Sequence, residues 1–270
     1  MAYTAPYRKV MAILNVTPDS FYSASRAESD VAIAQRVAQM VAEGADIIDI
    51  GGYSTRPGAA EVAESEECRR VMQGVEMCRK VAPEVTLSID TFRASVAESV
   101  LAKYDNVIIN DITAGEADPR LVEVVAHYGA PMVAMHTRGT PQTMARLTDY
   151  DDVVREVVDY LGRRAEWLQG RGVSEVVLDP GFGFAKTIEQ NFELLGRLAE
   201  VAALGLPVLA GISRKSFIYK TLGSTPEDVL EATSALHWAC LDGGAAILRV
   251  HDTAPARQVI KLYEKIHQLL

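Results

Sequence analysis

The chain has 270 residues, of which 49% are hydrophobic and 23% charged, a balance typical of a globular protein and not of a disordered or fibrous one. Its 27 basic and 36 acidic residues give a net charge of −9, which excludes general binding to nucleic acid but leaves room for a local basic pocket for a small anion. Because no run of about 18 apolar residues is present and the N-terminus lacks the apolar segment of a signal peptide, we expect a cytoplasmic protein without a membrane segment.

The cysteines give no sign of a disulfide framework or a zinc site. Cys68 and Cys78 fall in one helical stretch and Cys240 in another, without the paired spacing that zinc ligands need. We therefore expect three reduced thiols.

Short runs rich in Val, Ile and Leu alternate with longer helical patterns along the whole chain. Most of these runs are apolar throughout, as expected for parallel strands that are buried on both faces. The predicted strands are 10–14, 46–50, 85–89, 107–109, 131–134, 175–178, 207–210 and 246–250. The predicted helices include 30–43, 64–81, 93–103, 151–169, 188–201, 226–242 and 254–270.

Turn residues mark the ends of these helices. Asp118-Pro119 and Thr225-Pro226 have the pattern of an N-cap followed by a first-turn proline. Several glycines stand where a left-handed residue ends a helix. The predicted helix stops are Gly44, Gly129, Gly172, Gly205 and Gly243.

Eight strand–helix units without a break in composition predict an α/β protein with one domain over residues 1–270. The favoured architecture is a closed (β/α)8 TIM barrel, with a doubly wound open sheet as the alternative. The longest excursion between units, residues 135–150, reads as a loop and not as a second domain.

Active sites of such barrels form where strands end and helices begin. The segments after the predicted strands are rich in polar residues, whereas the opposite ends carry little besides helix stops, and this asymmetry predicts an enzyme. The polar segments are Asn15-Val-Thr-Pro-Asp-Ser-Phe-Tyr22, Gly51-Gly-Tyr-Ser-Thr-Arg-Pro-Gly58, Asp90-Thr-Phe-Arg93, Asn110-Asp-Ile-Thr113, His136-Thr-Arg-Gly-Thr-Pro141, Asp179-Pro-Gly-Phe-Gly-Phe-Ala-Lys186, Gly211-Ile-Ser-Arg-Lys-Ser216 and the pair Arg249 and His251.

The first group of candidates consists of short acceptors at the ends of buried strands, Asp90, Asn110 and Asp179. Carboxylates and an amide that converge can bind the N–H edge of an amidine-like heterocycle through paired hydrogen bonds. Asp90 has a competing interpretation, because aspartate at such a position often caps the next helix.

The second group, Lys215, Arg249, His251 and Asn15, forms a predicted anion pocket with room for a hard cation. The segment Asp252-Thr253-Ala254-Pro255 opens the last helix and directs free amides at the same end of the barrel.

Other polar residues are expected to be structural. Asp111 reads as a helix cap or a buried acceptor, and the role of His136 at a strand end stays open. The histidines in helical segments are His127, His237 and His267.

The strand ends resemble those of the dihydropteroate synthase family over essentially the whole chain. The matching segments occur in the order of the family, one per strand. They are Asn15-Val-Thr-Pro-Asp-Ser-Phe21, Gly51-Gly-Tyr-Ser-Thr-Arg-Pro-Gly58, Ser88-Ile-Asp-Thr91, Asn110-Asp-Ile112, Asp179-Pro-Gly-Phe-Gly-Phe184, Ser213-Arg-Lys-Ser216 and Arg249-Val-His251.

This resemblance implies a transferase of folate biosynthesis. Members of the family condense 6-hydroxymethyl-7,8-dihydropterin pyrophosphate with p-aminobenzoate to give dihydropteroate and pyrophosphate. It also implies Mg²⁺ as a cofactor, a homodimer, sulfonamides as inhibitors, and no nucleic-acid or membrane partner.

The resemblance assigns roles to individual positions. Asp90, Lys215 and Arg249 are the implied catalytic residues. The implied pterin site is Asp90, Asn110, Asp179 and Lys215. The implied pyrophosphate site is Asn15, Arg249 and His251, with Asn15 also a ligand of Mg²⁺. The implied p-aminobenzoate site is Thr55, Arg56, Pro57, Phe184 and Ser216, and Phe21 belongs to a mobile first loop.

The chain departs from the family pattern in two loops. The usual Ser-Phe-Ser-Asp-Gly-Gly of the first loop is Ser20-Phe-Tyr-Ser-Ala-Ser-Arg26 here, and Tyr53 replaces a more usual Glu. Two alternatives stay open from the sequence: a pterin-dependent methyltransferase, which needs a corrinoid partner, and a paralogue that binds pterin without turnover.

Overall fold

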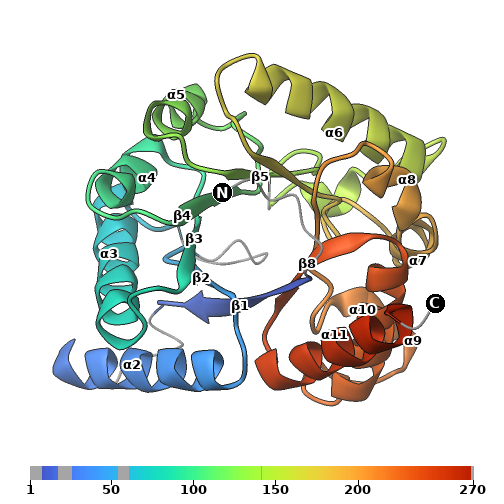
Figure 1. The fold of residues 1–270 in the computed structure, drawn as a ribbon. Helices are drawn as coiled ribbons and strands as arrows, with labels where there is room; N and C mark the ends of the chain where they lie inside the picture. The colour runs from blue at the N-terminus through green and yellow to red at the C-terminus, as the bar shows by residue number, and fades with distance from the viewer. Residues whose placement is uncertain (1–7, 18–25, 54–60, 141, 269–270) are drawn as a thin grey trace.

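The computed structural model describes residues 8–17, 26–53, 61–140 and 142–268, and its eight parallel strands form a closed barrel in chain order (Figure 1). The predicted TIM barrel is therefore confirmed, and the open sheet is wrong. The strands are β1 Lys9–Asn15, β2 Ile47–Gly51, β3 Thr86–Asp90, β4 Val107–Asp111, β5 Met132–Met135, β6 Val176–Asp179, β7 Val208–Ala210 and β8 Ala245–Val250.

Helices surround the barrel on its outside (Figure 1). Along the described residues they are α2 Arg26–Ala42, α3 Glu64–Val81, α4 Ala94–Leu101, α5 Pro119–Tyr128, α6 Val153–Gln169, α7 Ile188–Gly196, α8 Leu198–Ala202, α9 Ser216–Thr221, α10 Leu230–Asp242 and α11 Thr253–His267, with a short 3₁₀ helix η1 Met144–Arg146. None of the described helices is long and apolar enough to span a membrane.

Several helix boundaries differ from the predictions, and α2, for example, begins at Arg26 and not at residue 30. Two of the differences have local reasons. The predicted helix 188–201 is split between α7 and α8 at Arg197, whose φ of −115° and ψ of 19° are not helical. The Thr225-Pro226 pair does not begin α10, which starts at Leu230. It forms a separate turn instead, in which Thr225 Oγ1 donates to Asp228 Oδ2 at 2.8 Å.

The glycine predictions hold at four of five positions. Gly44, Gly129, Gly172 and Gly205 all have positive φ, between 63° and 96°. The prediction for Gly243 is wrong by one residue, because Gly243 has φ −74° and the left-handed residue is Gly244, at φ 91°.

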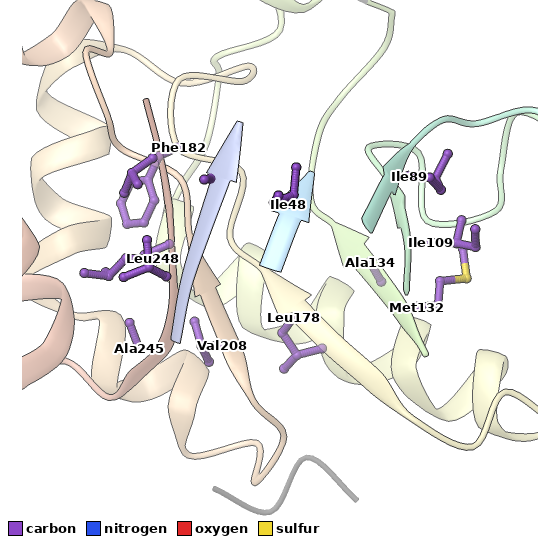
Figure 2. Close-up of a cluster of buried hydrophobic side chains, with 14 of the residues drawn as sticks. Ile48, Ile89, Ile109, Met132, Ala134, Leu178, Phe182, Val208, Ala245 and Leu248 are labelled. Carbon is purple, nitrogen blue, oxygen red and sulfur yellow. The ribbon is translucent and has the colours of Figure 1, made fainter. Parts of the chain in front are cut away.

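Alternate residues of each strand face the two sides of the barrel wall. Outward-facing residues such as Ile48, Leu178 and Leu248 belong to the large core between the strands and the helices, part of which Figure 2 shows. A separate cluster fills the inside of the barrel. It consists of Met11, Ile47, Ile108, Val133, Val177, Leu209 and Ile247.

The cysteines are reduced, as predicted. Cys78 and Cys240 are buried in the outer core and Cys68 is half-buried. Burial raises the pKa of the Cys78 thiol to about 12, so this side chain behaves as an inert apolar group.

Candidate active site

The inside of the barrel changes from apolar to polar toward the carboxyl ends of the strands. On β2, the residues Ile47, Asp49 and Gly51 face the same side because side chains alternate along a strand. Ile47 belongs to the apolar interior cluster, Asp49 is fully buried, and Gly51 pairs in register with Asp90 of β3. The polar layer therefore lies directly on a packed apolar floor.

Arg249 of β8 is at the centre of the polar layer. Its Nε donates to Asp49 Oδ2 at 2.7 Å, and its Nη2 donates to Asp90 Oδ2 at 2.8 Å. The side chain is mostly buried, with 21% exposed. One guanidinium thus joins β2, β3 and β8 and brings two predicted catalytic residues, Asp90 and Arg249, into direct contact.

The buried carboxylate of Asp49 was not among the predicted site residues. Besides Arg249, it accepts a hydrogen bond from Ser88 Oγ at 2.6 Å. Asn110 Nδ2 lies 3.2 Å from its Oδ2 and 3.4 Å from its Oδ1. Asp49 therefore connects the predicted pterin residue Asn110 with the predicted anion-binding residue Arg249.

Asp179 and Lys215 form the opposite side of the site. Asp179 is the last residue of β6, and its Oδ1 accepts from the Gly181 backbone N–H at 2.7 Å. Lys215 is the N-cap of α9, where its Nζ donates to the Phe182 carbonyl and lies 4.3 Å from the centre of the Phe184 ring. One predicted pterin residue, Lys215, therefore contacts the aromatic ring of Phe184, which is predicted to contact p-aminobenzoate.

Burial sets the protonation behaviour of these groups. It raises the pKa of Asp90 to about 7, although the Arg249 guanidinium opposes the shift. It also raises the pKa of Asp179. Burial lowers the pKa of Lys215 to about 8, while the Asp179 carboxylate opposes that change. Groups with such displaced pKa values, clustered in one place, are characteristic of functional sites.

A buried lysine, Lys186, holds the loop between β6 and α7 in place. Lys186 Nζ donates to the carbonyls of Gly181 at 3.0 Å and Phe184 at 3.1 Å and lies 3.1 Å from His136 Nδ1. Burial and the nearby Lys186 lower the pKa of His136 to about 3, so its imidazole is neutral and accepts this third hydrogen bond. His136, whose role the sequence left open, therefore supports the loop from inside.

Gly181 is required by this arrangement. Its φ is +70°, and a Cβ atom there would lie 2.0 Å from the His136 carbonyl oxygen. Only glycine lets the loop pass this close to the end of β5.

His251 follows β8, with its backbone N–H donating to Ser213 Oγ at 3.1 Å and its Nδ1 at 3.1 Å from the same oxygen. Asp252 is the N-cap residue of α11, but its carboxylate pairs with Arg214 at 2.7 Å instead of capping the helix. The first amides of α11 thus stand beside His251, in line with the predicted anion pocket.

Asn15, the last residue of β1, supplies an amide oxygen at the same end of the barrel. Asn15 and Asp90 both lie next to Gly51. A Cβ atom added to Gly51 would be 3.4 Å from Asn15 Oδ1 and 3.9 Å from Asp90 Oδ2. Within the described parts of the chain, no group of three or more His, Cys, Asp or Glu side chains can hold a metal. A single amide oxygen suits Mg²⁺ only where an anionic ligand supplies the other oxygens.

The structural interpretation is confirmed for Asp111 but not for Asp90. Asp111 accepts from the backbone N–H groups of Thr113 at 2.7 Å and Gly115 at 2.6 Å, so it shapes the loop after β4. Asp90 pairs with Arg249, and the first amide of α4, that of Ala94, bonds to Asp118 instead. The capping role considered for Asp90 is therefore wrong.

The helical histidines take no part in the site. His127 is exposed on α5, and His267 stacks on Tyr263 at 3.9 Å between ring centres. His237 is buried in α10. All three fit the predicted structural roles.

Several predicted residues lie outside the described part of the chain, namely Phe21, Thr55, Arg56 and Pro57. Ser216 is the first residue of α9.

Tyr53, which departs from the family pattern, packs edge-on against Phe92 at 5.5 Å and lies under the Arg93 guanidinium at 5.4 Å. Arg93 is in turn paired at 2.8 Å with Glu67, which is fully buried.

Comparison with known proteins identifies the family. A model of the pterin binding enzyme family matches residues 11–251. The dihydropteroate synthase of Synechocystis sp. is 41% identical over 260 residues, which cover 95% of this chain and 89% of that protein.

Solved structures give the same result. The Xanthomonas albilineans dihydropteroate synthase with 4-aminobenzoic acid has a TM-score of 0.89 and 36% identity, covering 97% of this chain and 94% of that chain. The Thermus thermophilus dihydropteroate synthase in complex with 6HMPPP has a TM-score of 0.81 and 35% identity, with the same coverage of 97% and 94%. This chain belongs to the dihydropteroate synthase family of pterin-binding enzymes.

Proposed function

We propose that this chain is a dihydropteroate synthase, which condenses 6-hydroxymethyl-7,8-dihydropterin pyrophosphate with p-aminobenzoate. The observation that carries the proposal is the contact of Arg249 with Asp49 and Asp90 at the carboxyl end of the barrel. It joins the residues suited to a flat heterocycle with those suited to a diphosphate. The relatives crystallised with 6HMPPP and with 4-aminobenzoic acid support both substrates.

The pterin ring binds to Asp90, Asn110, Asp179 and Lys215. A heterocycle with adjacent N–H donors needs acceptors, which the carboxylates and the amide oxygen supply. Lys215 supplies a donor for a ring carbonyl oxygen. Because this pocket is buried, the hydrogen bonds are made without competition from bulk water.

The diphosphate binds to Arg249 and His251, next to the first amides of α11. A guanidinium presents a planar set of donors that matches phosphate oxygens. We propose that Asn15 would be a protein ligand of Mg²⁺, which would bind there together with the anionic oxygens of the substrate. When bound there, Mg²⁺ neutralises charge on the departing diphosphate.

The reaction begins with cleavage of the bond between the pterin methylene carbon and the diphosphate oxygen, whose electron pair leaves with the diphosphate. Arg249 stabilises the charge that develops on this leaving group. Asp90 stabilises the positive charge left on the dihydropterin ring. The neutral amine of p-aminobenzoate then forms the new carbon–nitrogen bond, and the proton that the nitrogen loses passes to solvent. No residue acts as a nucleophile.

p-Aminobenzoate lies beside the Phe184 ring, which Lys215 holds through its ammonium group. Ser216 receives the carboxylate at the start of α9. Thr55, Arg56, Pro57 and Phe21 are assigned to this site and its loops on the family resemblance alone, because they fall outside the described residues.

The chain works as a homodimer in the cytoplasm in this proposal. Leu262 and Ile266 on α11 expose large apolar side chains, 62% and 47% respectively, which would be covered in a dimer. Sedimentation at micromolar concentration tests this point: a monomer would contradict it.

Pyrophosphate release tests the proposed function most simply. We expect release to depend on both the pterin pyrophosphate and p-aminobenzoate, with dihydropteroate formed in equal amount. Pterin binding without release would favour the inactive paralogue. Methyl transfer to a corrinoid protein would favour the methyltransferase.

A further inference from the structure

The orientation of the Asn110 side chain has a chemical cause in the structure. An asparagine amide ends in one acceptor, the oxygen, and one donor group, the NH₂, and its neighbours decide which of them points where. A carboxylate only accepts. Because both oxygens of Asp49 lie within 3.4 Å of one end of the Asn110 amide, that end must be Nδ2.

Asp49 is itself held in place from two further sides. Its Oδ1 accepts from Ser88 Oγ at 2.6 Å, and its Oδ2 accepts from Arg249 Nε at 2.7 Å and lies 2.6 Å from Arg249 Nη2. The Asp49 side chain has no exposed surface. A buried carboxylate with three donor residues around it has little freedom to rotate, so the constraint passes to its partners.

We infer that Asp49 is a positioning residue that sets the specificity of the pterin pocket by fixing the Asn110 amide. With Nδ2 directed at Asp49, the remaining atom available to a ligand is Oδ1. Asn110 therefore acts as an acceptor and selects an N–H group on the ring. This inference rests on the proposed function, since it concerns the pterin ring of that reaction.

The same carboxylate couples the two halves of the substrate. Asp49 fixes the Arg249 guanidinium on the diphosphate side and the Asn110 amide on the pterin side. Loss of its negative charge should therefore disturb the binding of both the pterin ring and the diphosphate.

An exchange of the two side chains tests the assignment. Asp49→Asn places an NH₂ near Asn110, which then turns to present its own NH₂ to the ligand. We expect a rise of about 100-fold in the Kd of the pterin pyrophosphate, because a buried donor facing a donor is left unpaired. Asn110→Asp places two carboxylates face to face and should weaken binding to a similar extent.

The double variant Asp49→Asn with Asn110→Asp restores a hydrogen bond between the two side chains, with the donor and the acceptor exchanged. The asparagine introduced at position 49 can then accept from Arg249 and donate to the carboxylate at position 110, whose other oxygen again faces the ligand as an acceptor. We expect the double variant to bind at least about tenfold more tightly than either single variant. Binding no tighter than the weaker single variant would overturn the inference.

Asp46→Asn is a matched control. Asp46 directly precedes β2, accepts from a backbone N–H (Val10, at 2.7 Å) and pairs with an arginine, Arg257, but it stands at the amino end of the strand. Its substitution removes the same charge, and pterin binding should stay within about twofold of the unchanged chain. A loss of pterin affinity as large as that of Asp49→Asn would overturn the inference, because the change in net charge would then explain the effects of both variants.

A neutron structure of the unchanged chain needs no variant to fold. We expect two deuterons on the Asn110 atom that faces Asp49, and an atom without deuterons there would overturn the inference. Binding is measured by pterin fluorescence without turnover. If the unchanged chain binds pterin pyrophosphate but makes no dihydropteroate, the proposed function fails while these binding and neutron tests still decide the role of Asp49.

Discussion

The inside of the barrel has two regions that differ in what they contribute. Toward the amino ends of the strands, Ile108 of β4 packs in the apolar interior cluster with Ile47 and Val177. Two residues further along the same strand, Asn110 lies against Asp49 in the polar layer. The first region contributes apolar packing to the barrel, and the second contributes the polar side chains that we assign to the ligand site.

The largest expected effect comes from removing Arg249. Arg249→Ala leaves the carboxylates of Asp49 and Asp90 facing each other without a cation. We expect kcat/KM for the pterin pyrophosphate to fall by at least about 10³-fold, since the leaving group loses its main stabilising charge. Breaking the buried pair should also lower the free energy of unfolding by about 3–5 kcal/mol. Steady-state kinetics and urea unfolding measure the two, and unchanged affinity for the diphosphate would contradict the anion-pocket assignment.

The charge of Asp90 should affect activity and stability in opposite directions as the pH rises. Burial raises its pKa to about 7, so the folded protein binds a proton there more tightly than the unfolded chain does. Its contribution to stability is present below the ordinary pKa of an aspartate and is lost as pH rises through about 7. Activity needs the charged form, so kcat/KM should rise over the same interval.

Asp90→Asn tests both parts of this balance. We expect kcat to fall by about 10²-fold, and the rise of kcat/KM near pH 7 to disappear, because the asparagine does not titrate. Thermal unfolding of the variant should show a smaller decrease in stability between roughly pH 4 and pH 7 than the unchanged chain, because Asp111 and Asp179, whose pKa values burial also raises, still contribute. Full turnover in the variant would rule out the charge-stabilising role.

A comparison of alanine variants at Gly181 and Gly205 distinguishes an effect on the loop after β6 from an effect of backbone strain alone. Both have positive φ, +70° and +77°, but a Cβ at Gly181 meets the His136 carbonyl whereas none meets an atom within 4 Å at Gly205. Gly205→Ala should cost about 1 kcal/mol of stability, as expected for strain alone, with kinetics unchanged. Gly181→Ala should cost more and raise KM for p-aminobenzoate about tenfold, because Phe184 moves with the loop. Equal effects in the two variants would contradict the proposed loop support.

The smallest kinetic effect is expected in the apolar region. Ile108→Ala removes buried methyl groups and should lower the free energy of unfolding by about 2–5 kcal/mol. KM for both substrates should stay within about twofold, because the polar layer rests on other strands as well. A large change in KM at unchanged stability would show that the two regions are not separate.

The fold could be predicted from the sequence because its signals are local. Parallel strands buried on both faces read as apolar runs, and the eight runs correspond to the eight strands. The residues at the ends of those runs, such as Asn15, Asp90 and Asp179, therefore fall at one end of the barrel. The end of a helix was harder to predict where two adjacent glycines could each be the left-handed residue, as at Gly243 and Gly244.

The role of Asp49 could not be predicted because it depends on contacts across the barrel. Asp49 stands inside an apolar strand, and its partners Ser88 and Arg249 lie 39 and 200 residues away in sequence. A charged residue in the middle of a buried strand was the available signal, since such a group needs a partner. Lys186, with His136 50 residues away, is a similar case.

A crystal structure of this chain with the pterin pyrophosphate tests the central claim most directly. We expect the pterin ring among Asp90, Asn110, Asp179 and Lys215, with the diphosphate against Arg249 and His251. A ligand bound elsewhere on the barrel, or a ring that makes no hydrogen bond to these side chains, would contradict it.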